Sequence, residues 1–189
     1  MSKIIAVSGK IGSGKNALCD IIGSMVGQHK ILAFADDLKH IVSILSGLPI
    51  GSMYTEEGKN TFVESYGMTA GEMLQKIGTD VLRQHFDTDV WVKSLYNKIK
   101  EGDMVLIPDV RFPNEAQFLR DKGATLIRIN GDPVGNRAKS KRDQTHPSET
   151  ALDSWTDWDL VIENNGTIEE LKEKVQNFLA GNQLVMSFS

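Results

Sequence analysis

The segment 9–16 reads GKIGSGKN and constrains the fold more than any other part of the chain, because it has the GxxxxGK spacing of a phosphate-binding loop. The apolar run 4–7 before it is typical of a strand buried on both faces. Apolar residues recur at helical spacing over 17–25, so the loop is expected to join a central strand to a helix. Glycines allow backbone N–H groups to surround a phosphate, and Lys15 reaches its β and γ oxygens. A glycine-rich turn without a ligand is the alternative.

Asn16 follows the loop lysine, where such loops usually carry a Ser or Thr that ligates Mg²⁺. Its side-chain amide oxygen is a candidate ligand of the ion or of one of its waters. We therefore retain Asn16 as a candidate magnesium ligand, although its residue type departs from the usual pattern.

Length and composition limit the function classes to which the chain can belong. The 189 residues are expected to form one domain, 1–189, and the net charge of −4 gives no general attraction to nucleic acid. The single cysteine, Cys19, excludes an internal disulfide and a multi-cysteine metal site, and it is expected to be buried. No apolar run approaches the roughly 20 residues of a membrane span, so we expect no membrane contact and a cytoplasmic location.

Short apolar runs alternate with helical patterns along the rest of the chain. Buried strands are expected over 31–35, 104–109, 124–129 and 159–162. This alternation predicts a three-layer α/β fold, in which helices flank a parallel sheet of about five strands. The Gly-rich stretch 48–68 is expected to be irregular and to form a mobile flap.

Capping signals predict where two of the helices begin. Asp36 is placed to cap the helix that follows the second strand. Thr69 and Glu72 have the spacing of a capping box, which predicts a helix over 69–86.

Two residues near this second helix have open roles. Gly78 interrupts the helical pattern at a cost of roughly 1 kcal/mol relative to Ala, which a close approach by another backbone or by a ligand would explain. Trp91 lies in the next helical pattern, where packing in the core and stacking on a ligand are both open to an aromatic ring.

Charged side chains follow two of the predicted strands. The strand 104–109 ends in Asp109 and is followed by Arg111 and Glu115. Lys39 lies one helical turn beyond the end of the strand 31–35. Because the carboxyl ends of parallel strands form the ligand-binding edge of such a sheet, we expect these side chains to share a cleft. An Asp at the end of a strand is typical of the Walker B metal site, and the planar fork of an Arg suits a phosphate. The alternatives are an ion pair of Arg111 with either carboxylate, and a solvated helix start at Lys39.

A cluster of cations lies within 130–150, where a long loop is expected. Its members are Arg137, Lys139, Lys141 and Arg142. A charge run is usually a solvated face. Since this loop follows a strand of the expected phosphate-binding sheet, a lid that brings cations onto a transferring phosphate is an equally good interpretation. His146 is expected to cap or to hydrogen-bond within the lid, without a catalytic role.

These features favour phosphoryl transfer between two bound molecules. Lys15 and Mg²⁺ would hold a donor triphosphate, while Arg111 and Lys39 would hold an acceptor phosphate. An acceptor that is already an ionised phosphate requires no catalytic base.

Six segments extend the pattern to nearly the whole chain: GKIGSGKN at 9–16, LQKIGTDVLRQHFDTDVWVK at 74–93, IPDVRFPNEA at 107–116, GATLIRI at 123–129, THPSE at 145–149 and DLVIENNGTIEELKEKV at 159–175. On these segments the chain resembles the phage-type deoxynucleoside monophosphate kinases, within the P-loop nucleoside monophosphate kinases. The resemblance implies a single P-loop kinase domain with an acceptor region at about 36–90 and a lid at about 130–150. It also implies transfer of the ATP γ-phosphate, with Mg²⁺, to a deoxynucleoside monophosphate.

The resemblance also implies a set of site residues, by position. Those expected to bind ATP are Gly12, Ser13, Gly14, Lys15, Asn16 and Ala17. Those expected to bind the monophosphate are Ile11, Lys39, Gly78, Thr79, Trp91, Asp109, Arg111, Glu115 and Thr145. Asn16 and Asp109 are the expected metal ligands, Asp109 through water. The expected catalytic residues are Lys15, Asp109, Arg111, Arg137 and Arg142, since family members carry a loop cation at the position of Ile11 or Gly12 that a lid arginine would replace here.

Small-molecule nucleotides are therefore the expected partners, and a homodimer is consistent with the family. Two other functions are open from sequence. A dephospho-coenzyme A kinase would need a base such as Asp37 or Asp109 for its hydroxyl acceptor. A non-catalytic ATP-binding module would bind ATP without transfer, and the absence of an NKxD motif counts against a GTPase switch.

Overall fold

The computed structural model describes residues 2–135 and 143–182. Its centre is a five-stranded sheet in the order β2–β5–β1–β6–β7, in which every neighbouring pair is parallel. The strands are β1 (Lys3–Ser8), β2 (Lys30–Ile31), β5 (Met104–Val110), β6 (Thr125–Asn130) and β7 (Leu160–Glu163). The predicted parallel sheet of about five strands is confirmed.

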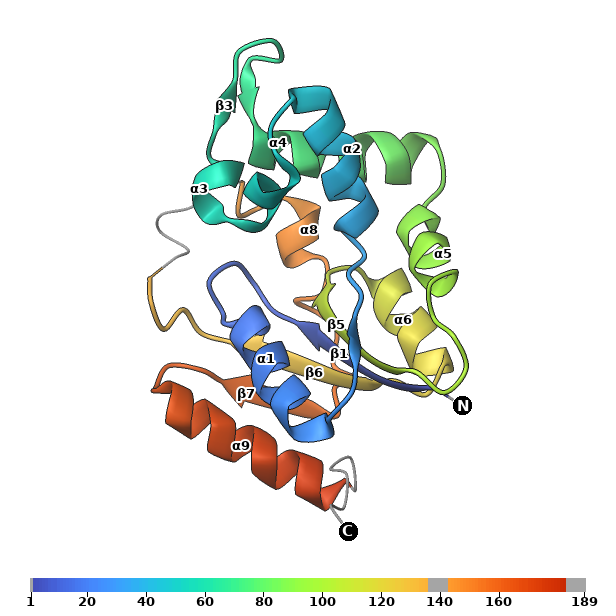
Figure 1. Cartoon of the computed structure of the whole chain (residues 1–189), viewed down its shortest axis with the longest axis vertical. Coiled ribbons are helices and arrows are strands. Elements are labelled where there is room, and N and C mark those ends of the chain that lie inside the picture. The colour runs from blue at the N-terminus through green and yellow to red at the C-terminus, as the bar shows by residue number, and fades with distance from the viewer. Residues whose placement is uncertain (1, 136–142, 183–189) are drawn as a thin grey trace.

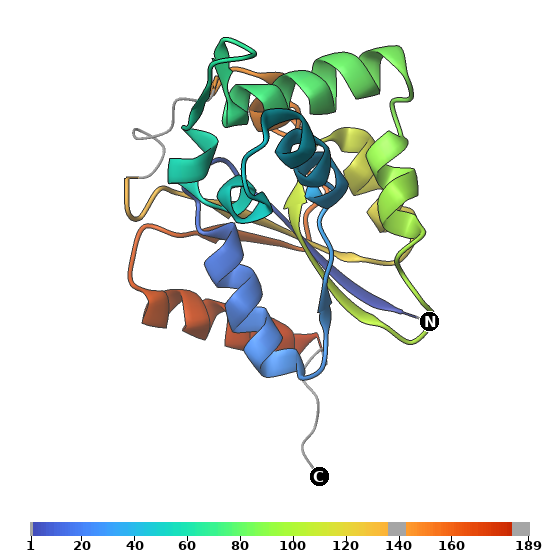
Figure 2. The same ribbon diagram turned by 45° about the horizontal axis from the view of Figure 1, so that its top comes forward.

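Helices cover both faces of this sheet, as Figures 1 and 2 show. On one face, α1 (Lys15–Val26) and α9 (Ile168–Gly181) pack on Ile5 and Val7. On the other face, Ile4 and Ala6 contribute to a second core. Helices α2 (Asp36–Ser46), α4 (Ala70–Gln75), α5 (Val90–Tyr96) and α6 (Pro113–Asp121) contribute side chains to that second core. Alternate residues of β1 thus face opposite layers, and the predicted three-layer α/β fold is confirmed.

The second strand is shorter and more exposed than the sequence predicted. Only Lys30–Ile31 pair with β5, and both residues are exposed at the edge of the sheet. The chain then leaves the ladder because the N–H groups of Phe34 and Ala35 each donate to the Asp109 carboxylate at 2.9 Å. The prediction of a buried strand over 31–35 was therefore wrong: only Ile31 lies in the strand, and it is exposed, whereas Ala33 and Phe34 are buried outside the strand.

The stretch 48–68 is ordered into short elements, so the prediction of an irregular segment was wrong. It contains η1 (Ile50–Tyr54), α3 (Glu56–Lys59) and a hairpin of β3 (Phe62–Val63) with β4 (Met68–Thr69). The side chain of Thr55 caps α3 by accepting the N–H of Gly58 at 3.0 Å. Met53 and Val63 are buried in the core, which fixes the segment to the body of the protein.

The helix predicted over 69–86 is present, but its second half is wound more widely. Thr69 and Glu72 form the expected capping box, with the Glu72 N–H donating to the Thr69 hydroxyl at 3.2 Å. After α4 the chain continues as the π-helix η2 (Lys76–Arg83). A Cβ at Gly78 would lie 2.4 Å from Leu38 Cδ2, so the glycine lets a side chain of α2 pack there, rather than another backbone.

Two further sequence predictions have clear outcomes. Asp36 is the first residue of α2 and not its cap, because its carboxylate accepts the N–H of Ala33 at 3.1 Å. Cys19 is buried on α1 as expected, and burial raises the pKa of its thiol to about 12. Among the described residues, no helix is long and apolar enough to span a membrane.

Candidate active site

A cavity of about 970 Å³ lies at the carboxyl ends of β1 and β5, where ligands bind in open α/β sheets. The phosphate loop, the start of α2, η2, α5 and the turn before α9 all contribute to its wall. Thirteen of the predicted site residues line it: Ile11, Gly12, Gly14, Lys15, Asn16, Ala17, Lys39, Gly78, Thr79, Trp91, Asp109, Arg111 and Glu115. The predicted convergence of strand-end residues on one cleft is thereby seen. Arg137 and Arg142 lie outside the described residues.

Two glycines of the phosphate loop adopt the left-handed backbone conformation that glycine permits. Gly12 and Gly14 have φ values of 80° and 94°, which residues with a Cβ rarely adopt. The ammonium of Lys15 donates to the carbonyl oxygens of Gly9 at 2.7 Å and Lys10 at 2.8 Å. The lysine thus folds back across its own loop.

Ser13, within the loop, is not among the described residues that line the cavity. The residue is fully buried, and its carbonyl oxygen accepts the side-chain N–H of Asn164 at 3.0 Å. The same Asn164 nitrogen would lie 2.6 Å from a Cβ at Gly14. Asn164 therefore braces the loop from the end of β7, a role that sequence analysis missed.

Asp109 holds the backbone that enters α2. Each of its two oxygens accepts one N–H, from Phe34 and from Ala35, and burial raises the pKa of the carboxyl. A carboxylate oxygen keeps a further lone pair after accepting one hydrogen bond, so water-mediated contact with an ion stays open to Asp109.

The described residues contain no cluster of three His, Cys, Asp or Glu side chains that could hold a metal ion. Mg²⁺ in kinases is usually held by one or two side chains together with substrate phosphates. Asn16, which is exposed at the start of α1, and Asp109 fit that arrangement.

Lys39 lines the cavity from α2, with only 15% of its side chain exposed. Its ammonium is 3.9 Å from the centre of the Tyr54 ring and 3.5 Å from Asp36 Oδ1. The Tyr54 hydroxyl donates to the same carboxylate oxygen at 3.1 Å. The packed position of Lys39 argues against the alternative of a solvated helix start.

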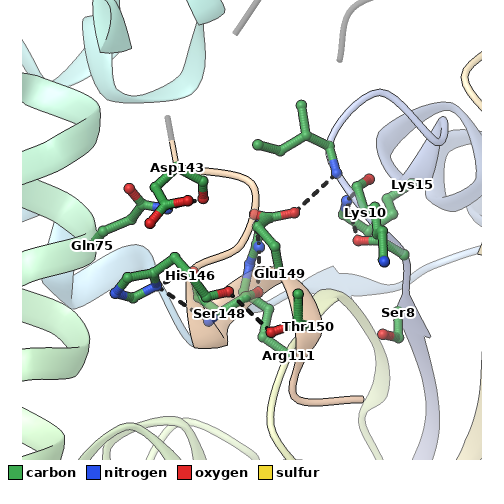
Figure 3. Close-up of polar contacts among 12 residues, drawn as sticks. Ser8, Lys10, Lys15, Gln75, Arg111, Asp143, His146, Ser148, Glu149 and Thr150 are labelled. Carbon is green, nitrogen blue, oxygen red and sulfur yellow. Dashed lines mark hydrogen bonds and ion pairs between the residues drawn. The ribbon is translucent and has the colours of Figure 1, made fainter. Parts of the chain in front are cut away.

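Arg111 is directed toward α8 (Pro147–Thr150), on the side of the cavity that faces the phosphate loop (Figure 3). One of its terminal nitrogens, Nη1, pairs with the Glu149 carboxylate and donates to the Ser148 carbonyl at 2.8 Å. Burial alone would lower the pKa of the guanidinium, but Glu149 raises it, so Arg111 stays charged. Sequence analysis assigned no role to Glu149.

Glu115 is buried, with 1% of its surface exposed, and pairs with Arg83 rather than with Arg111. Its carboxylate also accepts the backbone N–H groups of Arg111 at 2.7 Å and Phe112 at 3.1 Å. Burial raises the pKa of this carboxyl to about 7, although Arg83 opposes the rise. The side-chain ion pair of Arg111 with Glu115 that was considered from sequence is therefore absent, since the two meet only through the backbone.

Arg83 is a third residue that sequence analysis missed, after Asn164 and Glu149. It lies on η2, is 8% exposed, and places its guanidinium 4.0 Å from the centre of the Phe112 ring. Its Nη2 pairs with Glu115, and its Nη1 donates to the Thr88 carbonyl at 3.1 Å. The spacing of the sequence gave no signal of the ion pair between Arg83 and Glu115, because these residues are 32 positions apart.

Trp91 packs in the core, which confirms one of the two roles left open from sequence, while stacking on a ligand stays a prediction. It is 5% exposed, packs in the core and also lines the cavity. Its indole N–H donates to the Gly78 carbonyl at 3.0 Å, across the widened turn of η2. Thr79, the next residue, is buried on the same wall.

Thr145 is the described residue for which the predicted contact is least supported. It is exposed, and its N–H and hydroxyl both donate to Asp143, at 2.8 and 2.7 Å. It is not among the described residues that line the cavity. Its neighbour His146 accepts the Ser148 N–H at 3.2 Å, as the prediction of a local cap required.

Comparison with known proteins decides the family. The family model described as deoxynucleotide monophosphate kinase matches residues 52–175. A putative deoxynucleotide monophosphate kinase of Acanthamoeba polyphaga mimivirus is 34% identical over 188 residues, which cover 91% of this chain and 93% of the viral protein. The chain belongs to the deoxynucleotide monophosphate kinase family. It is therefore a nucleotide kinase, and so a phosphotransferase.

Two further likenesses cover different shares of the chains. The deoxynucleotide monophosphate kinase of Enterobacteria phage T4 is 36% identical over 112 residues, which cover 57% of this kinase and 44% of the phage protein. The solved shikimate kinase from Aquifex aeolicus covers 96% of this kinase and 98% of its own chain, with 15% identity and a TM-score of 0.47. That structural likeness is too distant to add to the sheet order described above.

Proposed function

We propose that this kinase transfers the γ-phosphate of ATP to a deoxynucleoside monophosphate, giving ADP and the deoxynucleoside diphosphate. The observation that supports this most is the single cavity that has the phosphate loop on one wall and Arg111 and Lys39 on another. Kinase membership requires two substrates, and one cavity with two anion-binding walls suits two phosphorylated molecules.

The donor half would take ATP through the phosphate loop. Lys15 would leave its contacts with loop carbonyls for the β and γ oxygens, while the N–H groups at the start of α1 face the phosphates. Ile168, the first residue of α9, and Val134 line the same cavity, and their exposed apolar side chains would suit a base. Mg²⁺ bound with ATP would offset the charge of the triphosphate, and Asn16 and Asp109 are its proposed protein contacts.

The acceptor half would take the monophosphate. Arg111 and Lys39 would bind its phosphate, and Trp91 with Thr79 would border the nucleoside. The acceptor oxygen is already ionised, so the chain needs to align it with the γ-phosphorus and not to deprotonate it. Arg137 and Arg142 are proposed to supply the remaining positive charge when the lid closes.

The dephospho-coenzyme A alternative has less support, because both of its candidate bases are engaged. Asp37 pairs with Lys98 at 2.8 Å, hydrogen-bonds to Ser94, and is not among the described residues lining the cavity. Asp109 accepts two backbone N–H groups. A homodimer remains a prediction from the family alone.

The test is a coupled assay of ADP release with ATP and Mg²⁺. The acceptors are dGMP, dTMP, dCMP, dAMP, the matching ribonucleotides and dephospho-coenzyme A. We expect turnover with one or more deoxynucleoside monophosphates. Turnover with dephospho-coenzyme A alone would reject the proposal, as would ATP binding without transfer to any acceptor.

A further inference from the structure

Glu149 is a buried carboxylate that touches both walls of the cavity. It lies on α8 and is 7% exposed. One of its oxygens pairs with Arg111 Nη1, and the other accepts the N–H of Ile11, in the phosphate loop, at 3.1 Å. Figure 3 shows its side chain between Arg111 and the loop. A single carboxylate therefore connects the proposed donor loop to the proposed acceptor arginine.

The segment that carries Glu149 is held in place by other contacts as well. The Asp153 carboxylate pairs with Lys10 of the phosphate loop at 2.7 Å. On the acceptor side, the Gln75 amide donates to the Asp143 carbonyl at 3.0 Å. The Lys10–Asp153 pair is exposed to solvent and contributes little, so the buried contacts of Glu149 itself define the position of its carboxylate.

The chemistry of these contacts suits alignment. A charge-assisted hydrogen bond is stronger and shorter than a neutral one, so it fixes a long arginine side chain in one rotamer. Arg111 and Ser148 line the cavity, whereas Glu149 is not among the described lining residues. Glu149 thus acts behind the residues that would touch the substrates.

We propose that Glu149 is a positioning residue, which fixes Arg111 and the loop backbone at Ile11 relative to each other for phosphoryl transfer. This inference rests on the proposed function. In-line transfer depends on alignment of the two phosphates, and a misplacement of about 1 Å costs on the order of a hundredfold in rate.

A rival interpretation makes the opposite prediction. If the Glu149 carboxylate occupied the place of the acceptor phosphate, the acceptor would have to displace it from Arg111. Neutralising Glu149 would then strengthen acceptor binding. The sign of the change in the acceptor KM therefore separates the two interpretations.

The experiment compares Glu149→Gln with Asp153→Asn, in steady-state assays with the acceptor varied at saturating ATP. Glu149→Gln keeps the shape of the side chain and removes its charge. We expect kcat/KM for the acceptor to fall by about tenfold to a hundredfold, with a higher acceptor KM. Asp153→Asn, which alters the other contact of this segment with the loop, should stay within about twofold of wild type.

A double variant tests whether Glu149 acts through Arg111. Arg111→Gln with Glu149→Gln should lose no more than about twofold beyond Arg111→Gln alone, because residues that act as one unit are not additive. If Glu149→Gln does not fold, Glu149→Asp replaces it, since the shorter side chain keeps the charge but cannot hold both partners. Its expected loss is smaller than that of Arg111→Gln.

Four results would overturn the inference: unchanged kinetics in Glu149→Gln, a lower acceptor KM, an equal loss in Asp153→Asn, or full additivity in the double variant. Each of these leaves the proposed function standing, provided that the wild-type protein phosphorylates a deoxynucleoside monophosphate. A wild-type protein without that activity would instead reject the proposed function, and with it the role given to Glu149.

Discussion

Backbone groups hold the charged side chains of this site as firmly as other side chains do. Asp109 accepts two N–H groups from the turn before α2, and Glu115 accepts two from the turn before α6. Lys15 donates to two carbonyl oxygens of its own loop. The contacts of Asp109 and Glu115 fix these two carboxylates before a substrate arrives, which lowers the reorganisation that a transition state requires, whereas Lys15 would exchange its loop carbonyls for phosphate oxygens.

Replacing Arg111 tests the acceptor half of the site. In Arg111→Ala the acceptor KM should rise by about tenfold to a hundredfold, because a charge-assisted bond to phosphate is lost. The KM for ATP should change by less than about threefold. Arg111→Lys keeps the charge without the planar fork, so its acceptor KM should lie between those of wild type and Arg111→Ala. An acceptor KM unchanged in Arg111→Ala would remove this residue from the phosphate site.

The raised pKa of Glu115 makes stability depend on pH. Its pKa rises from 4.5 in the unfolded chain to about 7 in the fold, so the native state binds more protons between these values. The free energy of unfolding should therefore fall as pH rises from 4.5 to 7, by up to about 3 kcal/mol from this group. Glu115→Gln lacks the titration. Urea unfolding of both proteins at pH 5 and 7.5 measures the difference, and parallel pH curves would contradict the prediction.

At the scale of single elements, local signals predicted the start of the helix at Thr69 and most of the strands, but not the shortness of β2. The capping box at Thr69 was predictable because its partners are three residues apart. The shortening of β2 was not, because it depends on Asp109, about 75 residues away in sequence. The π-helical turn of η2 was also hidden, since the indole N–H that donates to its Gly78 carbonyl belongs to Trp91, on α5.

The packing of α3 on η1 gives a prediction about stability. A Cβ at Gly58 would lie 2.2 Å from the Ser52 carbonyl oxygen, and backbone cannot move aside as a side-chain tip can. Gly58→Ala should lower the free energy of unfolding by about 1–3 kcal/mol. Gly51→Ala in η1 is the matched control, because no atom lies within 4 Å of its added Cβ, and it should change stability by less than about 0.5 kcal/mol. Equal effects in denaturant titrations would count against this account.

At the scale of the whole molecule, the donor and acceptor walls belong to one cavity although they come from distant parts of the chain. The phosphate loop follows the central strand, and η2, which packs against the core on the other face of the sheet, lines the same cavity. The segment with Glu149 links them. The two proposed substrates would lie close enough in this cavity to be joined chemically.

A linked ligand tests that arrangement. A compound in which two nucleosides are joined by a polyphosphate should bind at least about a hundredfold more tightly than ATP, because the second contact becomes intramolecular. Lys15→Ala removes the lysine proposed to contact the triphosphate, so this variant should lose most of the gain in affinity. Isothermal titration calorimetry provides the affinities. A linked compound that binds no better than ATP would mean that the two ligands do not share the cavity.

The sequence by itself determined the loop, the strand that precedes it and the edge of the sheet at which the site forms. These features are local, or follow from chain direction in a parallel sheet, so spacing is enough to predict them. Only the tertiary structure decided which partners the charges take: Arg83 for Glu115, Glu149 for Arg111, and Asn164 for the loop. Such pairs join residues 32 or more positions apart, and the pattern along one chain carries no record of which distant side chains folding brings together.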